Sequence, residues 1–165
     1  MIELKERGIL IFSKISSENN LYLKFLTQKD EIITGLSFGG STKKKKNIFQ
    51  IGYFLNIVIK NKNKNFPNSI SAELSKPYYH NIFNDKYKMH ALLTLVSLLN
   101  ISIIEGQKVS GLFNLSENII EILANEKKWI INYFIFLLNL LKIIGYDIDY
   151  QKNTSKDYLN LDSLQ

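Results

Sequence analysis

"NLYLKFLTQ" (residues 20–28) alternates between apolar and other side chains. Successive side chains of a strand point to opposite faces, so Leu21, Leu23 and Phe25 would share one face of an extended chain. The same two-residue period recurs in "SISAELS" (residues 69–75). Both stretches therefore predict strands with one buried and one exposed face.

Three more strands are predicted in the first half of the chain, separated by turn residues. They are "RGILIFSKIS" (7–16), "EIITGLSF" (31–38) and "YFLNIVIKNK" (53–62). Short connections favour antiparallel pairing, and five such strands in succession indicate a small closed or partly closed barrel rather than a parallel sheet.

The second half has a helical pattern, with apolar residues three and four positions apart from Tyr78 onward. One long helix is predicted over residues 80–104, and Pro77 marks the boundary with the strands. Residues 1–77 and 78–165 are therefore expected to form two small domains, and the fold class is α+β.

Two further helices follow the long one. "NLSENIIEIL" (114–123) would begin at Ser116 as a capping residue, and the apolar run from Lys127 to Ile144 would end at Gly145. The most apolar window, residues 129–144, is shorter than the roughly 20 apolar residues that span a bilayer. We expect a buried helix there rather than a membrane segment.

The start of the chain and the lack of cysteine bear on the compartment. "MIELKERGILIF" carries charges before its first apolar run and has no small-residue cleavage site, so it is not expected to be a secretory signal. With no cysteine, the sequence contains no disulfide and no cysteine-built zinc site. A cytoplasmic location is expected.

The positive charge is concentrated in the first half of the chain. The net charge is +6 over 165 residues. Residues 1–76 hold 13 Lys and Arg against 6 Asp and Glu, whereas residues 77–165 hold 8 against 9. A general bias toward lysine would not segregate the lysines in this way, so the asymmetry predicts an anionic partner for the first half.

The basic residues gather in "GLSFGGSTKKKKNIFQIG" (residues 35–52). Gly39 and Gly40 would let the backbone pass close to a ligand, and the hydroxyls of Ser41 and Thr42 can donate to phosphate oxygens. The loop is thus predicted to bind nucleic-acid phosphates, although a lysine-rich loop that only confers solubility explains the composition equally well. The predicted contacts are Lys43, Lys44, Lys45 and Lys46, extended by Arg7, Lys24, Lys60, Lys62 and Lys64.

Aromatic residues near this loop are candidate platforms for stacked bases. Tyr22, Phe38, Phe49 and Tyr53 flank the loop or face outward in the strand pattern. Each of them is more often a core residue than a platform, so none is assigned individually.

Catalytic motifs are absent from the sequence. There is no Walker loop, GxGxxG, HExxH or GxSxG. His80 and His90 are ten residues apart and fall on different helix faces, so they do not form a metal pair. Asp147 and Asp149 could face one cation, but aspartates after a helix more often make local turn bonds. We expect neither an enzyme nor a cofactor.

The ordered motifs of the chain resemble those of the bacterial recombination mediator RecO. They are Arg7-Gly8, Ser17 to Leu21, Leu26-Thr27, the glycine-to-lysine segment from Gly39 to Lys46, Phe49 to Gly52, and the helix ending Leu140 to Tyr146. The similarity covers nearly the whole chain and is strongest over residues 7–60 and 133–150. No single motif is specific, but the ordered set is.

This resemblance implies an OB-fold followed by a helical domain in a non-enzymatic, nucleoid-associated protein. Such a protein binds single- and double-stranded DNA and anneals complementary strands. It also implies work with RecR, and in many bacteria RecF, to load RecA on DNA covered by single-stranded DNA-binding protein, whose acidic C-terminal tail docks on the helical domain. The family's DNA-contacting residues map onto residues 43–46 and onto Lys24.

Three departures from the family pattern qualify these expectations. Ile51 stands where the family usually has proline, and no cysteine follows the Gly-Tyr ending, so a structural zinc is not expected. Relatives continue with more helices beyond the position of Gln165. We therefore expect this chain to be either a fragment or a reduced member of the family. An RNA-binding or translation-associated OB module and a helical adaptor protein stay open as alternatives.

Overall fold

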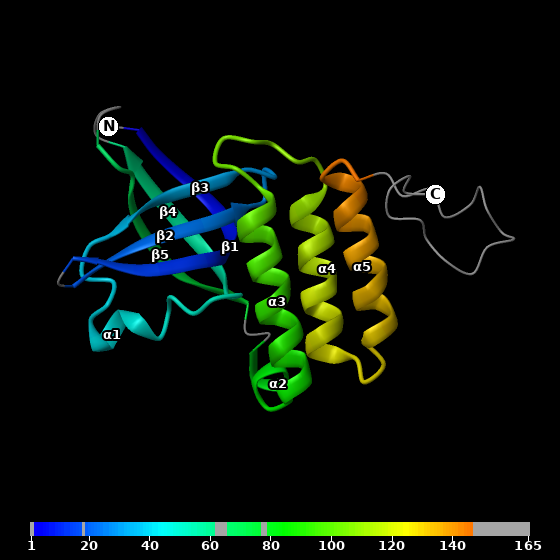
Figure 1. Ribbon diagram of the computed structural model, residues 1–165. Helices are drawn as coiled ribbons and strands as arrows, with labels where there is room; N and C mark the ends of the chain where they lie inside the picture. The colour runs from blue at the N-terminus through cyan, green and yellow to red at the C-terminus, as the bar shows by residue number, and fades with distance from the viewer. Residues whose placement is uncertain (1, 18, 62–65, 77–78, 147–165) are drawn as a thin grey trace, which may run out of the picture.

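A small β-barrel is followed by a layer of helices in the computed structural model, which describes residues 2–17, 19–61, 66–76 and 79–146 (Figure 1). Helix α3 lies nearest the barrel, and α4 and α5 follow side by side (Figure 1). The expected α+β class, with an OB-fold barrel before a helical domain, is confirmed.

All five predicted strands form. They are β1 (Ile2–Ser17), β2 (Asn20–Thr27), β3 (Ile32–Ser37), β4 (Phe54–Asn61) and β5 (Ser69–Lys76). Strand β1 begins at Ile2 rather than at Arg7. Its first part pairs with β4 and its second part with β2, with an irregularity between Leu10 and Phe12. This long, bent strand therefore joins the two sides of the barrel.

The barrel closes in the order β1-β2-β3-β5-β4. The expectation of antiparallel pairing is wrong at one position, because β3 and β5 are parallel where Leu36 pairs with Ser69. Strand β4 lies between them in the sequence, so β5 returns beside β3 in the same direction. Gly35 allows this approach, since a Cβ atom there would lie 2.5 Å from the carbonyl oxygen of Asn68.

The predicted helix over residues 80–104 is in fact two helices, α2 (Tyr79–Phe83) and α3 (Lys86–Ser102). Asp85 separates them with an extended backbone, and its carboxylate accepts from the backbone N–H groups of Tyr87 and Lys88. A capping aspartate thus starts a new helix inside a continuous apolar period.

The prediction that Ser116 caps the next helix is also wrong. Helix α4 (Leu112–Asn125) begins one turn earlier, after Gly111, and Ser116 is buried within it. The cap comes from the barrel instead. Asp30, in the turn after β2, accepts from the N–H groups of Gly111 and Phe113, each at 2.8 Å.

The last described helix, α5 (Ile130–Ile143), is stopped by Gly145 as predicted, two residues after its last helical residue. Gly145 has a φ of 104°, and the N–H groups of Gly145 and Tyr146 donate to the carbonyls of Lys142 and Leu141. This pattern is a Schellman motif, in which a left-handed residue satisfies the last carbonyls of a helix.

The expectation that α5 is buried is wrong for the described part of the chain. Phe136 and Leu140 are buried against the other helices, but Ile131, Phe134 and Ile135 are 73%, 61% and 51% exposed. No described helix combines the length and the apolar character needed to cross a membrane.

Buried apolar side chains form two clusters, one inside the barrel and one between the barrel and the helices. One cluster fills the barrel interior and includes Leu23, Phe25 and Phe49. The larger cluster joins the barrel residues Ile9 and Phe54 to α3, α4 and α5. The division at Pro77 stays a prediction, but the two halves are packed together through buried apolar side chains.

Candidate nucleic-acid interface

The four consecutive lysines form a single turn of helix, α1 (Lys43–Lys46), rather than an irregular loop. Gly39 has a φ of 66°, and the hydroxyl of Thr42 donates to its carbonyl oxygen at 2.8 Å. The turn is therefore built from the glycine and hydroxyl residues that precede the lysines.

Three of the four lysines of α1 present their charge to solvent. The side chains of Lys43, Lys45 and Lys46 are exposed, and none of the ion pairs between described residues includes them. The Lys45 ammonium donates only to the carbonyl oxygen of Phe38, at 3.3 Å. The side chain of Lys44 lies outside what the structure describes. Exposed ammonium groups held on one turn can attract phosphates without an internal carboxylate competing for them.

Backbone bonds fix α1 beside the turn between β1 and β2. The Ser41 N–H donates to the Asn19 carbonyl at 3.1 Å, and the Gly39 N–H donates to the side-chain oxygen of Asn20 at the same distance. Lys14, near the end of β1, is also exposed on this side of the barrel. Lys14 is not among the contacts predicted from the sequence. Its place in the strand period, opposite Tyr22, is the signal that could have identified it.

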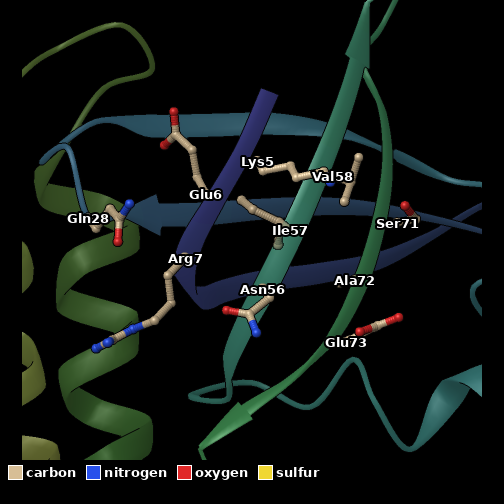
Figure 2. A pocket seen from close by; sticks show the side chains of 10 residues that line it. All are labelled: Lys5, Glu6, Arg7, Gln28, Asn56, Ile57, Val58, Ser71, Ala72 and Glu73. Carbon is tan, nitrogen blue, oxygen red and sulfur yellow. The ribbon is translucent and has the colours of Figure 1, made fainter. Parts of the chain in front are cut away.

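Arg7 lies at the seam between barrel and helices, away from α1. Its guanidinium lies 5.5 Å from the ring centre of Phe54 and 5.3 Å from that of Phe113, and it forms an ion pair with Glu117 of α4. Figure 2 shows Arg7 extending from β1 toward the helices. Arginine placed between aromatic faces gains cation–π attraction, so these contacts hold α4 against the barrel.

Lys24 points outward from β2, as its strand period predicts, but its ammonium meets α3. It donates to the carbonyl oxygens of Asn100 at 2.9 Å and Ile103 at 3.3 Å. Burial lowers the pKa of Lys24, while the charge of Glu105 acts in the opposite direction. Lys24 thus neutralises the C-terminal end of α3, where helix carbonyls carry partial negative charge.

Lys60 is at the other end of the barrel wall. It pairs with Glu3 at 3.4 Å across β4 and β1, and both side chains are partly exposed. Lys62 and Lys64 lie outside the described residues. The predicted contacts are therefore not gathered in one place, because α1, the helix seam and the β1–β4 wall are separate surfaces.

The four aromatic candidates have different environments. Phe49 is 7% exposed and belongs to the barrel core. Tyr53 lies 6.2 Å from the ring of Phe83, and burial raises its pKa. Tyr22 and Phe38 remain candidates for stacking on bases. Phe38 is 58% exposed, and Tyr22 faces outward against Phe12, whose ring lies 6.3 Å away.

Two cavities lie on different parts of the barrel surface. One, of about 640 Å³, lies on the outer wall formed by β1, β4 and β5, and Glu6 and Glu73 are among its lining residues (Figure 2). The other, of about 470 Å³, lies between β1 and α1. Only the second is lined by Lys46 of the predicted phosphate contact.

The described residues contain no candidate metal site, because no three His, Asp or Glu side chains among them come together. His80 and His90 are both exposed, on α2 and α3 respectively. Asp147 and Asp149 lie outside the described residues.

Comparisons with known proteins agree with this architecture. A family described as "Recombination protein O C terminal" matches residues 84–155, which begin between α2 and α3. The "DNA repair protein RecO" of Rickettsia canadensis is 26% identical over 92% of this chain and 62% of its own length. Those of Rickettsia bellii and Dinoroseobacter shibae are 26% and 21% identical, over 94% and 90% of this chain.

The chain spans slightly less than two thirds of the length of these relatives, 62% to 66%. The matches extend across the barrel as well as the helices, since they cover at least 90% of the chain. The resemblance expected from the ordered motifs is thereby confirmed. Together with the order of barrel and helices, these matches show that the chain is similar to RecO proteins.

Proposed function

We propose that this protein acts in DNA repair and homologous recombination by binding DNA and annealing complementary strands. The observation that carries the proposal is the exposed lysine turn α1, fixed beside the β1–β2 turn of a small barrel. Five-stranded barrels of this type bind single strands through a basic groove and aromatic platforms. The relationship to proteins named for DNA repair makes DNA the preferred nucleic acid.

The helical half is proposed to contact the recombination machinery. Its outer helix, α5, leaves Ile131 and Phe134 largely exposed, which supports a role in protein contact. The proposed partners are RecR, the C-terminal tail of single-stranded DNA-binding protein and, in organisms that have it, RecF, with RecA loaded as the result. No catalytic step is part of the proposal.

Alanine at all four lysines of α1 tests the DNA contact. If each lysine neutralises one phosphate of a single strand, log K against log salt has a slope of roughly −3 from these residues, and the variant loses that part of the slope. We expect weaker DNA binding at moderate salt with an unchanged far-UV circular dichroism spectrum. Fluorescence anisotropy with labelled strands, titrated over salt, measures both quantities.

The matched control removes the same charge elsewhere. Four lysines are exposed in the helical half, namely Lys86, Lys108, Lys127 and Lys128. Replacing them by alanine should leave most of the affinity for DNA. Equal losses in the two variants would mean that only net charge matters. RNA of the same sequence, tested alongside, separates the proposal from an RNA-binding module, for which RNA would bind more tightly.

Strand annealing in the presence of single-stranded DNA-binding protein tests the mediator role. We expect the unaltered chain to speed the annealing of coated complementary strands and the α1 variant to lose this effect as salt rises. A protein that binds a partner at any salt concentration but never retains DNA would instead fit the helical adaptor alternative.

A further inference from the structure

The cavity between β1 and α1 has the composition of a nucleotide site. We call it the hairpin pocket, because the β1–β2 hairpin and α1 form its walls. Its volume of about 470 Å³ lies within the range of small-molecule sites. Lys14 and Lys46 line it, and its lining residues include no carboxylate. The larger cavity on the outer wall differs, since the carboxylates of Glu6 and Glu73 line it together with the cations of Lys5 and Arg7.

Apolar side chains also line the hairpin pocket. Leu21 and Phe49 are 6% and 7% exposed and are anchored in the barrel core, while Ile15 is 64% exposed at the end of β1. Ile51 adds a further apolar side chain to the lining. Such a surface does not stabilise a bound phosphate, but it can pack against the face of a nucleobase.

Amide groups complete the lining of the hairpin pocket. Asn19 and Gln50 both line it, and amides can pair with the donors and acceptors on base edges. The Gln50 side chain donates from Nε2 to the carbonyl oxygen of Lys46 at 3.0 Å. This bond orients the amide and ties it to α1.

The walls of the pocket are joined without a ligand. The Ser41 N–H donates to the Asn19 carbonyl, and the Gly39 N–H donates to the side chain of Asn20, both at 3.1 Å. A pocket whose walls are already tied loses less conformational freedom when it binds a ligand.

From this combination we infer that the hairpin pocket takes up one unpaired base of a single strand, while Lys14 and Lys46 contact the adjacent phosphates. The inference rests on the proposed function and adds a mode of binding to it. A base within a duplex is stacked and paired, and it would have to leave the stack before entering. The pocket therefore favours single strands over duplexes.

Ile15→Asp, with Ser16→Asp as its control, tests the pocket. Ile15 lines the pocket and is exposed, so the change should not prevent folding. Ser16 is the exposed neighbour that does not line the pocket, and its variant adds the same charge. The probe is a single strand of alternating thymine and 2-aminopurine, free or annealed to its complement, with the complete chain.

We expect the fluorescence of 2-aminopurine to change when the single strand binds the unaltered chain. Ile15→Asp should abolish this change and weaken single-strand binding by about tenfold, the scale of one lost base stack. Duplex affinity should fall much less, and Ser16→Asp should have only a small effect on either.

Two results would overturn the pocket while leaving the proposed function intact. One is salt-dependent binding with no change in 2-aminopurine fluorescence. The other is an equal loss in Ile15→Asp and Ser16→Asp, which would mean that only the added charge matters. If the unaltered chain binds neither single strands nor duplexes, the proposed function itself fails.

Discussion

At the scale of single residues, Lys24 and Arg7 show how a cation in a basic domain is used for packing. Both belong to the positively charged first half of the sequence, and both reach across to the helices. Lys24 bonds to carbonyls at the end of α3, and Arg7 lies between Phe54 and Phe113. Their predicted DNA contacts are untested, and their observed contacts belong to the seam.

Lys24→Met should destabilise the fold. Charged hydrogen bonds of this kind contribute about 1–3 kcal/mol, partly offset here by the cost of burying the ammonium, so we expect a loss of about 1–2 kcal/mol at pH 7. Urea unfolding followed by circular dichroism measures it, with the exposed Lys5→Met as control. Unchanged stability combined with weaker DNA binding would favour the DNA contact instead.

The stability difference between the unaltered chain and Lys24→Met should depend on pH. Burial holds the pKa of Lys24 below its usual 10.5, with the charge of Glu105 acting against this shift. Between the lowered folded-state pKa and 10.5, the unfolded chain binds more protons at this residue, so its contribution to stability rises with pH. The stability of the unaltered chain relative to Lys24→Met should therefore increase as pH rises toward 10.5. A difference that falls over this range would contradict the assignment.

At the scale of elements, α4 depends on a cap that is distant in sequence. Asp30 has a left-handed backbone, with φ of 63°, which aspartate tolerates better than most residues. This conformation lets its two carboxylate oxygens accept from Gly111 and Phe113. A turn of the barrel thereby satisfies the first N–H groups of a helix in the other half.

Asp30→Ala should destabilise the protein by about 2 kcal/mol, because it removes the cap and places alanine in a left-handed conformation. Asp30→Asn keeps one acceptor and tolerates the backbone, so it should lose less. Asp30→Gly relieves the backbone but has no acceptor, which isolates the cap. The urea midpoints of the three variants are compared with that of the unaltered chain. Equal stability of Asp30→Ala and the unaltered chain would mean that the cap does not stabilise the fold.

At the scale of the whole molecule, the apolar cluster between the barrel and the helices predicts that the two unfold together. Gly35→Val tests this, because a Cβ at Gly35 would meet the Asn68 carbonyl at 2.5 Å and the side chain of Ile70 at 2.8 Å, where β3 and β5 close the barrel. Such overpacking costs about 1–3 kcal/mol. The single tryptophan, Trp129, lies at the start of α5 and reports on the helical half.

We expect Gly35→Val to lower the urea midpoint measured by Trp129 fluorescence as much as the one measured by circular dichroism. Ser71→Val, which adds bulk on the exposed side of β5, should leave both nearly unchanged. A Trp129 transition that stays at its original midpoint while the barrel is weakened would mean that the halves unfold independently.

Local spacing in the sequence was enough to predict the strands, the glycine stop after α5 at Gly145 and the concentration of charge in residues 43–46. These properties depend on side chains a few positions apart, and covalent geometry sets their direction. For the same reason the family motifs could be recognised without a structure. The period over residues 80–104 was misleading because the cap at Asp85 interrupts the helix without interrupting the apolar pattern.

Only the tertiary structure decided which partners these residues have. It capped α4 with Asp30 rather than Ser116, turned Lys24 and Arg7 toward the helices, paired β3 with β5 in parallel, and brought Lys14 and Lys46 to one pocket. Each of these contacts joins segments far apart along the chain. Their geometry follows from how the barrel closes and where the helices pack, and no local period in the sequence records it.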